Sequence, residues 1–353
     1  MSVNKFSSIP TIIQDAKKGK MFILVDDKNR ENEGDLIIPG SKCNSKNINF
    51  MAKHGRGLIC LALTSKKVKK LNLPLMSSIN KSRTQTAFTI SIEAKKGVTT
   101  GISAHDRAKT IKVAIKPNSN RNSIVSPGHV FPLVAKDGGV LERAGHTEAS
   151  VDISKLANLN PSAVICEVMN EDGTMARYKD LIPFAKKHKL KIAKIEDLIS
   201  YRLKNEKLIK LISNKKMKIK KFGNFDLKTF KNILDGSEHY AIIKGKFNKN
   251  KASRVRVIST NVLNSFFNFK KDIYKNSLKH LSKFNNFALI LIKGTSTNLS
   301  VLDNNKILRY YGIGAQIIKE LKIKNMILVS RTKKRIIALK GYGIKIAKQE
   351  IIK

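Results

Sequence analysis

An acidic run near the amino terminus is the first candidate for chemistry. Five of the 26 acidic residues of this strongly basic chain fall between positions 26 and 35, in the sequence DDKNRENEGD. If the segment is extended, the two-residue period of a strand places Glu31, Glu33 and Asp35 on one face, where three carboxylates repel one another unless a cation or a proton lies among them. Arg30 would supply part of that charge or bind a substrate phosphate. The alternative is a solvated turn, because the NEGD stretch has turn composition.

Two of the seven histidines, His129 and His146, fall in the segment SPGHVFPLVAKDGGVLERAGHT (126–147). Its glycines and prolines predict loops around both histidines. An isolated histidine is usually a structural hydrogen bonder, but loops of this kind carry binding and catalytic groups on a rigid scaffold.

Glu167 is the one charged residue in VICEVMN (164–170), which reads as a buried strand running into a hairpin-like turn at 171–174. A carboxylate inside an apolar strand needs a partner. Either Glu167 forms a salt bridge to a nearby arginine such as Arg177, or it is a general acid or base with a tuned pKa.

Four long segments resemble 3,4-dihydroxy-2-butanone 4-phosphate synthase of riboflavin biosynthesis. They are DDKNRENEGDLIIPG (26–40), TTGISAHDRAKTI (99–111), SPGHVFPLVAKDGGVLERAGHTEASVDISKLA (126–157) and CEVMNEDGTMAR (166–177), in family order across about residues 5–200. The resemblance implies an α/β domain of the α+β sandwich type that forms a homodimer. It also implies a magnesium-dependent lyase that converts D-ribulose 5-phosphate into L-3,4-dihydroxy-2-butanone 4-phosphate and formate without an organic cofactor.

The same resemblance assigns roles to single residues. It implies that Glu31 and His146 bind the metal and that His129 and Glu167 are needed for activity. Glu33 is expected to transfer protons or to support the metal ligands. The substrate is expected to contact Arg30, Glu31, Asp35, Glu167 and the loop of Arg143, Ala144, Gly145, His146 and Thr147, in which Arg143 and Thr147 suit the phosphate. Magnesium prefers oxygen ligands, and the imidazole of His146 among the ligands means that manganese would also fit.

Other residues of these segments are expected to be structural. The segment 99–107 resembles the substrate-side loop of the family, but the favoured alternative is that Asp106 and Arg107 pair and cap the helix that follows them. His105 is predicted to be an exposed bystander, and Cys60 a buried thiol of the core near the site. Three cysteines in the whole chain give no disulfide framework and fit a reducing cytoplasm.

The elements that must position these groups fall into two predicted domains, 1–203 and 204–353. The first is expected to end in a helix at 181–187, a strand at 190–193 and a closing helix at 195–203. The second alternates strands and a helix, which predicts a second α/β domain. Its expected elements are an exposed lysine-rich edge strand at 215–221, strands at 287–292, 325–330 and 344–352, and a helix at 312–321.

The chain carries a formal net charge of +43, and the excess is concentrated in the second half. Residues 1–200 hold 33 Lys and Arg against 18 acids, whereas residues 201–353 hold 36 against 8. This balance suits a polyanion or a lysine-coated surface of biased composition. Aromatic residues are not interleaved with the basic runs, so nucleic-acid binding is not expected. Neither a membrane span nor a signal sequence is expected.

The second half partly resembles GTP cyclohydrolase II, best at 310–330 and 335–352. The zinc segment expected after Val257 is replaced by ISTNVLNSFFNFKKDIY (258–274), and LIKGTSTNLS (291–300) replaces an expected segment rich in glycine and arginine. Residues 201–353 contain no cysteine and two histidines, His239 and His280. Because catalytic zinc normally needs three protein ligands, we expect neither zinc nor GTP hydrolysis. A structural or docking role is favoured over binding of polyanions such as nucleic acid.

Overall fold

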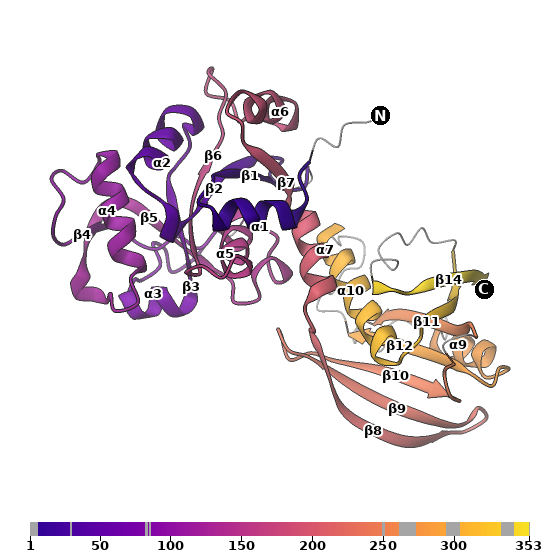
Figure 1. Cartoon of the computed structure of the whole chain (residues 1–353). Helices are drawn as coiled ribbons and strands as arrows, with labels where there is room; N and C mark the ends of the chain where they lie inside the picture. The colour runs from indigo at the N-terminus through magenta and orange to yellow at the C-terminus, as the bar shows by residue number, and fades with distance from the viewer. Residues whose placement is uncertain are drawn as a thin grey trace. The chain divides into compact units, whose positions relative to one another are not determined.

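The computed structural model describes residues 6–28, 30–81, 84, 86–248, 251–260, 273–293, 304–332 and 342–352. The chain divides into two compact units, Met1–Ile199 and Ser200–Lys353. The division falls inside helix α7 (Ile195–Asn205), a few residues before the expected boundary. Each unit is a mixed α/β domain built around a seven-stranded sheet, as the sequence predicted (Figure 1).

The first sheet has the strand order β4-β5-β3-β6-β2-β1-β7. Its strands are β1 (Phe22–Val25), β2 (Gly34–Pro39), β3 (Cys60–Thr64), β4 (Ile92–Ala94), β5 (Ile124–Ala135), β6 (Ser162–Glu167) and β7 (Lys191–Lys194). The pairs β3·β5 and β1·β7 are parallel, and the other neighbours are antiparallel. All four residues of the FILV run of β1 are buried, as is typical of a strand whose two faces are both covered.

Helices cover both faces of the first sheet. They are α1 (Ile9–Lys17), α2 (Ser45–Phe50), α3 (Ser65–Leu71), α4 (Ala104–Ile115), α5 (His146–Leu156) and α6 (Tyr178–Lys187), with short helical turns η1 (Gly40–Lys42), η2 (Met51–Gly55), η3 (Arg121–Ser123) and η4 (Gly139–Leu141). Helices α2, α4 and α6 contribute to one large apolar core, whereas α5 packs on Ala62 and Ala135 of the sheet. The small side chains of α5 let it lie close to the strands, and its residues His146–Ser154 are all buried.

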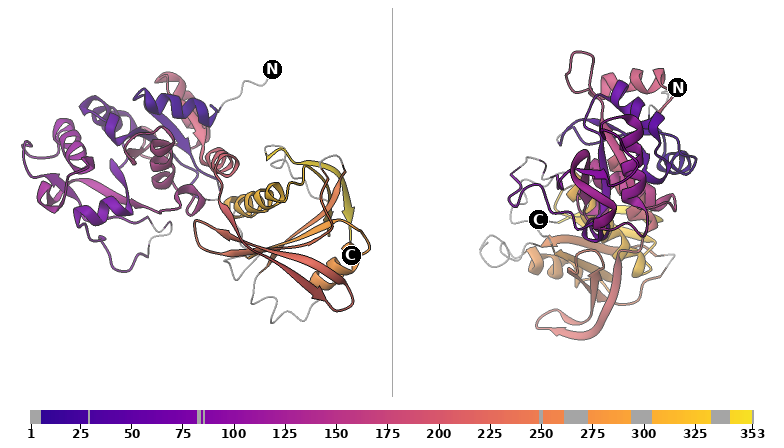
Figure 2. Two further views of the ribbon diagram at one scale, coloured as in Figure 1. Left: turned by 60° about the horizontal axis from the view of Figure 1, so that its bottom comes forward. Right: turned by 90° about the vertical axis from the view of Figure 1, so that its left-hand side faces the viewer.

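The second sheet has the order β14-β13-β11-β12-β10-β9-β8. Its elements are β8 (Ile209–Ile219), β9 (Gly223–Asn232), β10 (Glu238–Lys244), β11 (Ser253–Thr260), α9 (Ile273–Leu281), β12 (Phe287–Lys293), α10 (Asn304–Glu320), β13 (Asn325–Ser330) and β14 (Lys345–Ile351). Strands β8 to β10 form an antiparallel meander, and β11 to β14 pair in parallel. Helix α10 packs on one face and α9 on the other (Figure 2).

The expected elements of the second half are present, β13 with the expected ends and the others with shifted ends. The predicted lysine-rich strand is the second half of β8, which lies at the edge of the sheet, although Lys220 and Lys221 belong to the turn that follows. The predicted helix at 312–321 begins earlier, as α10. Most of the segment that replaces the expected zinc loop, and residues 294–300, lie outside the described residues. Among the helices that are described, none is long and apolar enough to cross a membrane.

Candidate active site

The acidic run forms a turn between β1 and β2, and Asp26 organises it. The Asp26 carboxylate accepts hydrogen bonds from the backbone N–H groups of Glu31, at 3.1 Å, and Glu33, at 2.9 Å. Asn32 adopts a left-handed conformation, with φ of 57°. Of the two alternatives left open by the sequence, Glu31 and Glu33 lie in a turn and not in an extended segment, since β2 begins at Gly34. The turn nevertheless directs both side chains, with Asp35, into one pocket.

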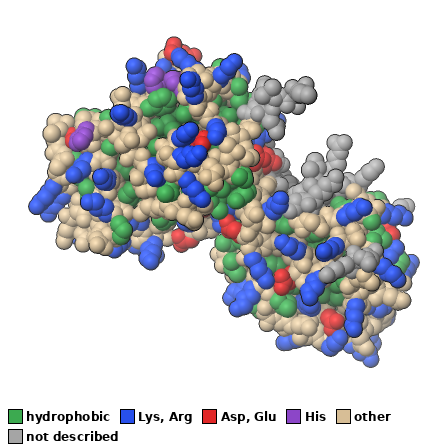
Figure 3. All heavy atoms as spheres, in the orientation of Figure 1, with side chains coloured by type: hydrophobic (Ala, Val, Ile, Leu, Met, Phe, Trp, Pro, Cys, Tyr) green, Lys and Arg blue, Asp and Glu red, His purple; other side chains and the backbone are tan. Residues whose placement is uncertain are grey.

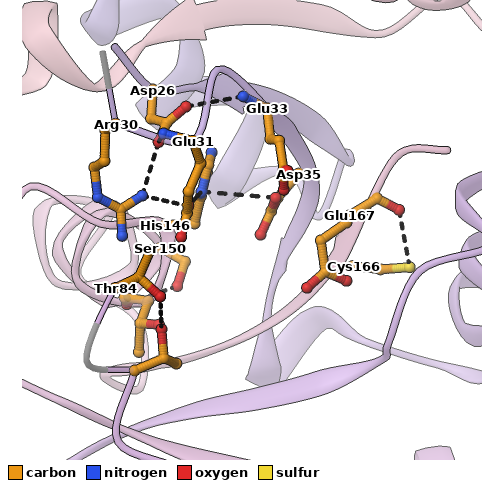
Figure 4. Close-up of polar contacts among 12 residues, drawn as sticks. Asp26, Arg30, Glu31, Glu33, Asp35, Thr84, His146, Ser150, Cys166 and Glu167 are labelled. Atoms are coloured by element: carbon orange, nitrogen blue, oxygen red, sulfur yellow. Dashed lines mark hydrogen bonds and ion pairs between the residues drawn. The ribbon is translucent and has the colours of Figure 1, made fainter. Parts of the chain in front are cut away.

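The centre of the pocket is His146, the first residue of helix α5. Its Nδ1 lies 3.6 Å from Glu31 Oε2 and 3.7 Å from Asp35 Oδ1. Arg30 adds a positive charge, because its Nη1 donates to Asp26 at 2.8 Å and also contacts Glu31. Figure 4 shows these side chains gathered around His146, with Glu167 beyond Asp35.

The charges in this cluster shift one another's pKa. Burial raises the pKa of Asp35, and the neighbouring carboxylates add to the effect. Burial lowers the pKa of His146, but the charge of Asp35 and the contact with Glu31 outweigh it and raise that pKa. Burial also opposes ionisation of Glu31, yet His146 and Arg30 lower its pKa to about 2. Glu31 is therefore an anion at neutral pH, and the site favours a positive group beside it.

The donor set fits a divalent cation. Asp26, Glu31 and His146 each offer one ligand atom, and these atoms lie within 4.8 Å of one another. Two buried atoms of the cluster, His146 Nε2 and Asp35 Oδ1, have no hydrogen-bond partner. Unpaired buried polar atoms are costly, and a cation held beside Glu31 would give Asp35 Oδ1 a partner. Carboxylate oxygens with one imidazole suit magnesium or manganese.

Glu167 lies at the end of β6, where its Cα faces that of Asp35 on β2. One carboxylate oxygen accepts a hydrogen bond from Leu58 N–H at 2.8 Å, and the side chain lines the pocket. Arg177 instead contacts Glu33, at 3.5 Å, and the carbonyl oxygens of residues 31 and 32, so the salt bridge expected as the alternative is not formed. Cys60 is buried and lines the same pocket of about 220 Å³, as expected.

The segment expected as a loop at 143–147 ends on a helix, because His146 and Thr147 form the first turn of α5, after Gly145 at its N-cap. Arg143 is already engaged: its guanidinium donates to Glu148 at 2.6 Å, to the Thr84 carbonyl oxygen at 3.0 Å and to the Thr86 hydroxyl at 2.9 Å. Thr84 and Thr86 line the pocket, and nothing in the sequence singled them out.

His129 lies in a strand and not in a loop. It is not among the described residues that line the pocket around His146. It lies within β5, because the strand continues through Pro127 and Gly128 by shifting its register against β4. Leu133 of the same strand lines the pocket, so His129 is about 13 Å farther along, at roughly 3.3 Å per residue. Its Nδ1 lies 2.8 Å from a carboxylate oxygen of Glu93, a contact that the sequence did not reveal.

The pairing expected between Asp106 and Arg107 is wrong. Asp106 accepts hydrogen bonds from the N–H and hydroxyl of Thr99, at 3.2 and 2.7 Å, and from Gly101 N–H at 3.1 Å. Ser103 is the cap of α4, and it accepts from Asp106 N–H. His105 is exposed, as predicted.

The sequence did not predict the role of Asp26 in the site. Asp26 belongs to the acidic run, but its role depends on hydrogen bonds to backbone N–H groups five and seven residues later in the chain.

Comparisons with known proteins show the family of the chain. The family model of 3,4-dihydroxy-2-butanone 4-phosphate synthase matches residues 10–201, and that of GTP cyclohydrolase II matches residues 210–285 and 278–351. A 3,4-dihydroxy-2-butanone 4-phosphate synthase of Photobacterium phosphoreum is 43% identical over 96% of this chain and 98% of its own length. The riboflavin biosynthesis protein RibBA of Aquifex aeolicus is 42% identical over 99% of this chain and 93% of its own.

Two solved structures are also similar. RibBX, a two-domain 3,4-dihydroxy-2-butanone 4-phosphate synthase from A. baumannii, has a TM-score of 0.85 at 38% identity and covers 98% of this chain and 99% of its own. A synthase in complex with two magnesium ions has a TM-score of 0.54 at 40% identity and covers 57% of this chain and 98% of its own. With the acidic cluster around His146 in place, the chain belongs to the 3,4-dihydroxy-2-butanone 4-phosphate synthase family of riboflavin biosynthesis.

Proposed function

We propose that the first unit converts D-ribulose 5-phosphate into L-3,4-dihydroxy-2-butanone 4-phosphate and formate in the pocket around His146. The observation that carries the proposal is the cluster of Glu31, Asp35 and His146, in which two buried atoms have no hydrogen-bond partner. Glu31 and His146 are the proposed metal ligands, with Asp26 beside them. A bound Mg²⁺ would supply Lewis-acid stabilisation of charge that develops on substrate oxygens.

The carboxylates of the pocket suit the proton transfers of this reaction. A proton must leave carbon 3 to form an enediol, water must be lost, and carbon 4 must depart as formate after rearrangement. Asp35 and Glu167 lie on neighbouring strands at one wall, and burial raises the pKa of Asp35. We assign proton transfer to Glu167 and substrate contact to Asp35, whereas Glu33, which faces Arg177, supports the turn or relays a proton.

The phosphate is assigned to the amino terminus of α5. Thr147 offers a hydroxyl and a backbone donor in the first turn, where the helix dipole favours an anion. Arg143 lies next to it and holds Thr84 and Thr86 at the pocket. Ala144 and Gly145 lie between Arg143 and Thr147, and their small size leaves room for the phosphate.

The proposal is tested by incubating the purified chain with ribulose 5-phosphate and measuring formate. Formate is expected to appear with Mg²⁺ or Mn²⁺ and to stop when a chelator is added. Formate release that continues at the same rate in the presence of chelator would refute the metal assignment.

We also propose a homodimer. His129 is assigned a catalytic role but lies outside the pocket of its own chain, so a second copy is the simplest way to bring it to a reacting group. Co-expressing chains carrying His129→Asn with chains carrying His146→Ala is expected to restore part of the activity that each variant lacks alone. If each variant is inactive alone and the mixture stays inactive, this arrangement is excluded.

The second unit is proposed to lack GTP cyclohydrolase II activity and to serve a structural or docking role. The support is the absence of cysteine from residues 201–353. Its two histidines are also engaged: Lys293 N–H donates to His239 at 3.2 Å, and His280 lies 3.5 Å from Glu350. Some relatives are described as bifunctional, such as a rice protein 38% identical to this chain. The proposal is therefore tested by measuring bound zinc and the release of formate from GTP. We expect no stoichiometric zinc and no formate from GTP.

The alternative for this unit is a polyanion-binding module. Its net charge supports the alternative, but in Figure 3 lysine and arginine are scattered over the visible face and do not gather in one patch. Binding of DNA with a steep dependence on salt would favour it.

A further inference from the structure

Glu93 contacts one ring nitrogen of His129. Glu93 lies in β4 with its side chain 11% exposed, and its Oε2 is 2.8 Å from His129 Nδ1. A carboxylate without a proton only accepts hydrogen bonds, so with Glu93 in that form Nδ1 is the donor of this contact. The neutral imidazole then keeps the lone pair of Nε2 free. The side chain of His129 is 42% exposed, so a reacting group can approach the ring.

Glu93 is itself held in place from other elements. Its second oxygen accepts a hydrogen bond from the hydroxyl of Thr110, at 3.3 Å, and that hydroxyl in turn accepts from Ala94 N–H at 3.0 Å. Thr110 is fully buried on helix α4. The carboxylate is therefore fixed by both its own strand and the neighbouring helix.

The loop before α4 closes over the same carboxylate. Gly101 has φ of 89°, and a Cβ at this position would lie 2.0 Å from Glu93 Oε2. Asp106 fixes this loop through the N–H groups of Thr99 and Gly101. The TTGISAHD segment thus packs against the partner of His129. Ion pairs on the protein surface are usually not held in place by a surrounding loop in this way.

We propose that Glu93 is the positioning residue of His129, and that it fixes the ring in the Nδ1–H tautomer so that Nε2 is presented for proton transfer. The inference rests on the proposed catalytic role of His129. A carboxylate that orients a histidine in this way is a common device of proton-transfer sites, because the wrong tautomer has its proton on the nitrogen that must react.

The test compares Glu93→Gln with Glu93→Asp in the full chain. The neutral amide no longer enforces a proton on Nδ1, so kcat is expected to fall by about 10- to 100-fold with little change in KM. The shorter carboxylate of Glu93→Asp is expected to recover a large part of the loss. Glu350→Gln, which alters the His280 contact in the second unit, is the matched control and is expected to keep full synthase activity.

NMR of ¹⁵N-histidine-labelled protein gives a readout that does not depend on turnover. The His129 signal, assigned with His129→Asn, is expected to report Nδ1–H in the parent chain and a growing Nε2–H population in Glu93→Gln. If Glu93→Gln fails to fold, Thr110→Val is expected to shift the tautomer and kcat in the same direction but less. An unchanged tautomer, or losses that match the folded fraction, would overturn the proposal.

The two failures are distinguishable. If His129→Asn keeps full activity, the catalytic role of His129 is wrong and Glu93 is only a structural partner. If His129→Asn is inactive but Glu93→Gln keeps the tautomer and kcat, only the positioning role is wrong.

Discussion

The Asp26 carboxylate accepts three hydrogen bonds, two from backbone N–H groups of the acidic turn and one from Arg30. Its side chain is 1% exposed. These bonds hold Glu31 at the position from which it reaches His146, so Asp26 acts on the site through backbone geometry.

We predict that Asp26→Asn weakens Mg²⁺ binding by about 10- to 100-fold, because the ligand Glu31 loses its support. Glu31→Gln and His146→Ala are expected to abolish metal binding and turnover while the fold is kept. Asp27→Asn is the matched control, since Asp27 is the neighbouring acid and is not one of the three described residues whose ligand atoms lie within 4.8 Å of one another. Calorimetric titration with Mg²⁺ measures the effect. Equal affinities in Asp26→Asn and Asp27→Asn would contradict the prediction.

Glu167 gives a second prediction at this scale. Glu167→Gln keeps the hydrogen bond to Leu58 N–H but cannot transfer a proton, so turnover is expected to fall by about 100-fold or more with metal affinity little changed. Glu171→Gln, in the exposed turn that follows, is expected to match the parent chain. If Glu167 is purely structural, Glu167→Gln would lose thermal stability and keep its activity per folded molecule.

The family resemblance predicted Glu31, Asp35, His146 and Glu167 as site residues, whereas the residue types alone indicated only the acidic run, two histidines in expected loops and an isolated carboxylate in a strand. Neither predicted Thr84, since a hydroxyl on a loop carries no chemical signal. The residue types also misplaced His129, because proline and glycine usually break a strand and here the strand accommodates them with a register shift.

At the scale of elements, a cluster of rings joins the turn after α2 to the end of α6. His54 and His188 lie with ring centroids 4.6 Å apart, and Phe50 and Phe184 flank them. Partial burial lowers the pKa of His54, helped by Lys53, Arg56 and Lys187. Burial also lowers the pKa of His188, and its repulsion from His54 adds to the effect.

This cluster predicts a pH dependence of stability. As the pH falls through about 6.5, the unfolded chain takes up protons on these histidines before the folded chain does, so stability is lost. The difference in urea midpoint between pH 7.5 and pH 5.5 is expected to shrink in His54→Gln and in His188→Gln. His105→Gln, at an exposed position, is the control and should leave the difference unchanged. A parent-like difference in both cluster variants would refute the prediction.

The elements that the sequence predicted best are those with continuous apolar runs. Strand β13 was predicted with its observed ends, and β12 to within one residue. Helix α10 was predicted too short because its first residues have a weaker apolar pattern. The turn at the acidic run was harder to predict, since charged residues fit an exposed turn and a strand lining a site equally well.

At the scale of the whole molecule, we predict that the first unit keeps its synthase activity when the second unit is removed. A chain ending at Lys204 is expected to keep most of its turnover, because the first unit has its own core and a solved synthase spans only 57% of this chain. Steady-state kinetics of the truncated and full chains measure this. Loss of the activity on truncation would show that the second unit is an obligatory support.

The edge strand β8 bears on the behaviour of the protein in concentrated solution. Two copies that met along this edge would bring the lysines of one strand, among them Lys215 and Lys218, close to those of the other, whereas Lys216 is paired with Asp226. In about 0.1 M salt, repulsion reaches roughly 10 Å, which is longer than the spacing of about 5 Å between paired strands. Near 1 M it reaches only about 3 Å. Ionic strength is therefore the variable that governs whether the molecules stay dispersed or stack edge to edge.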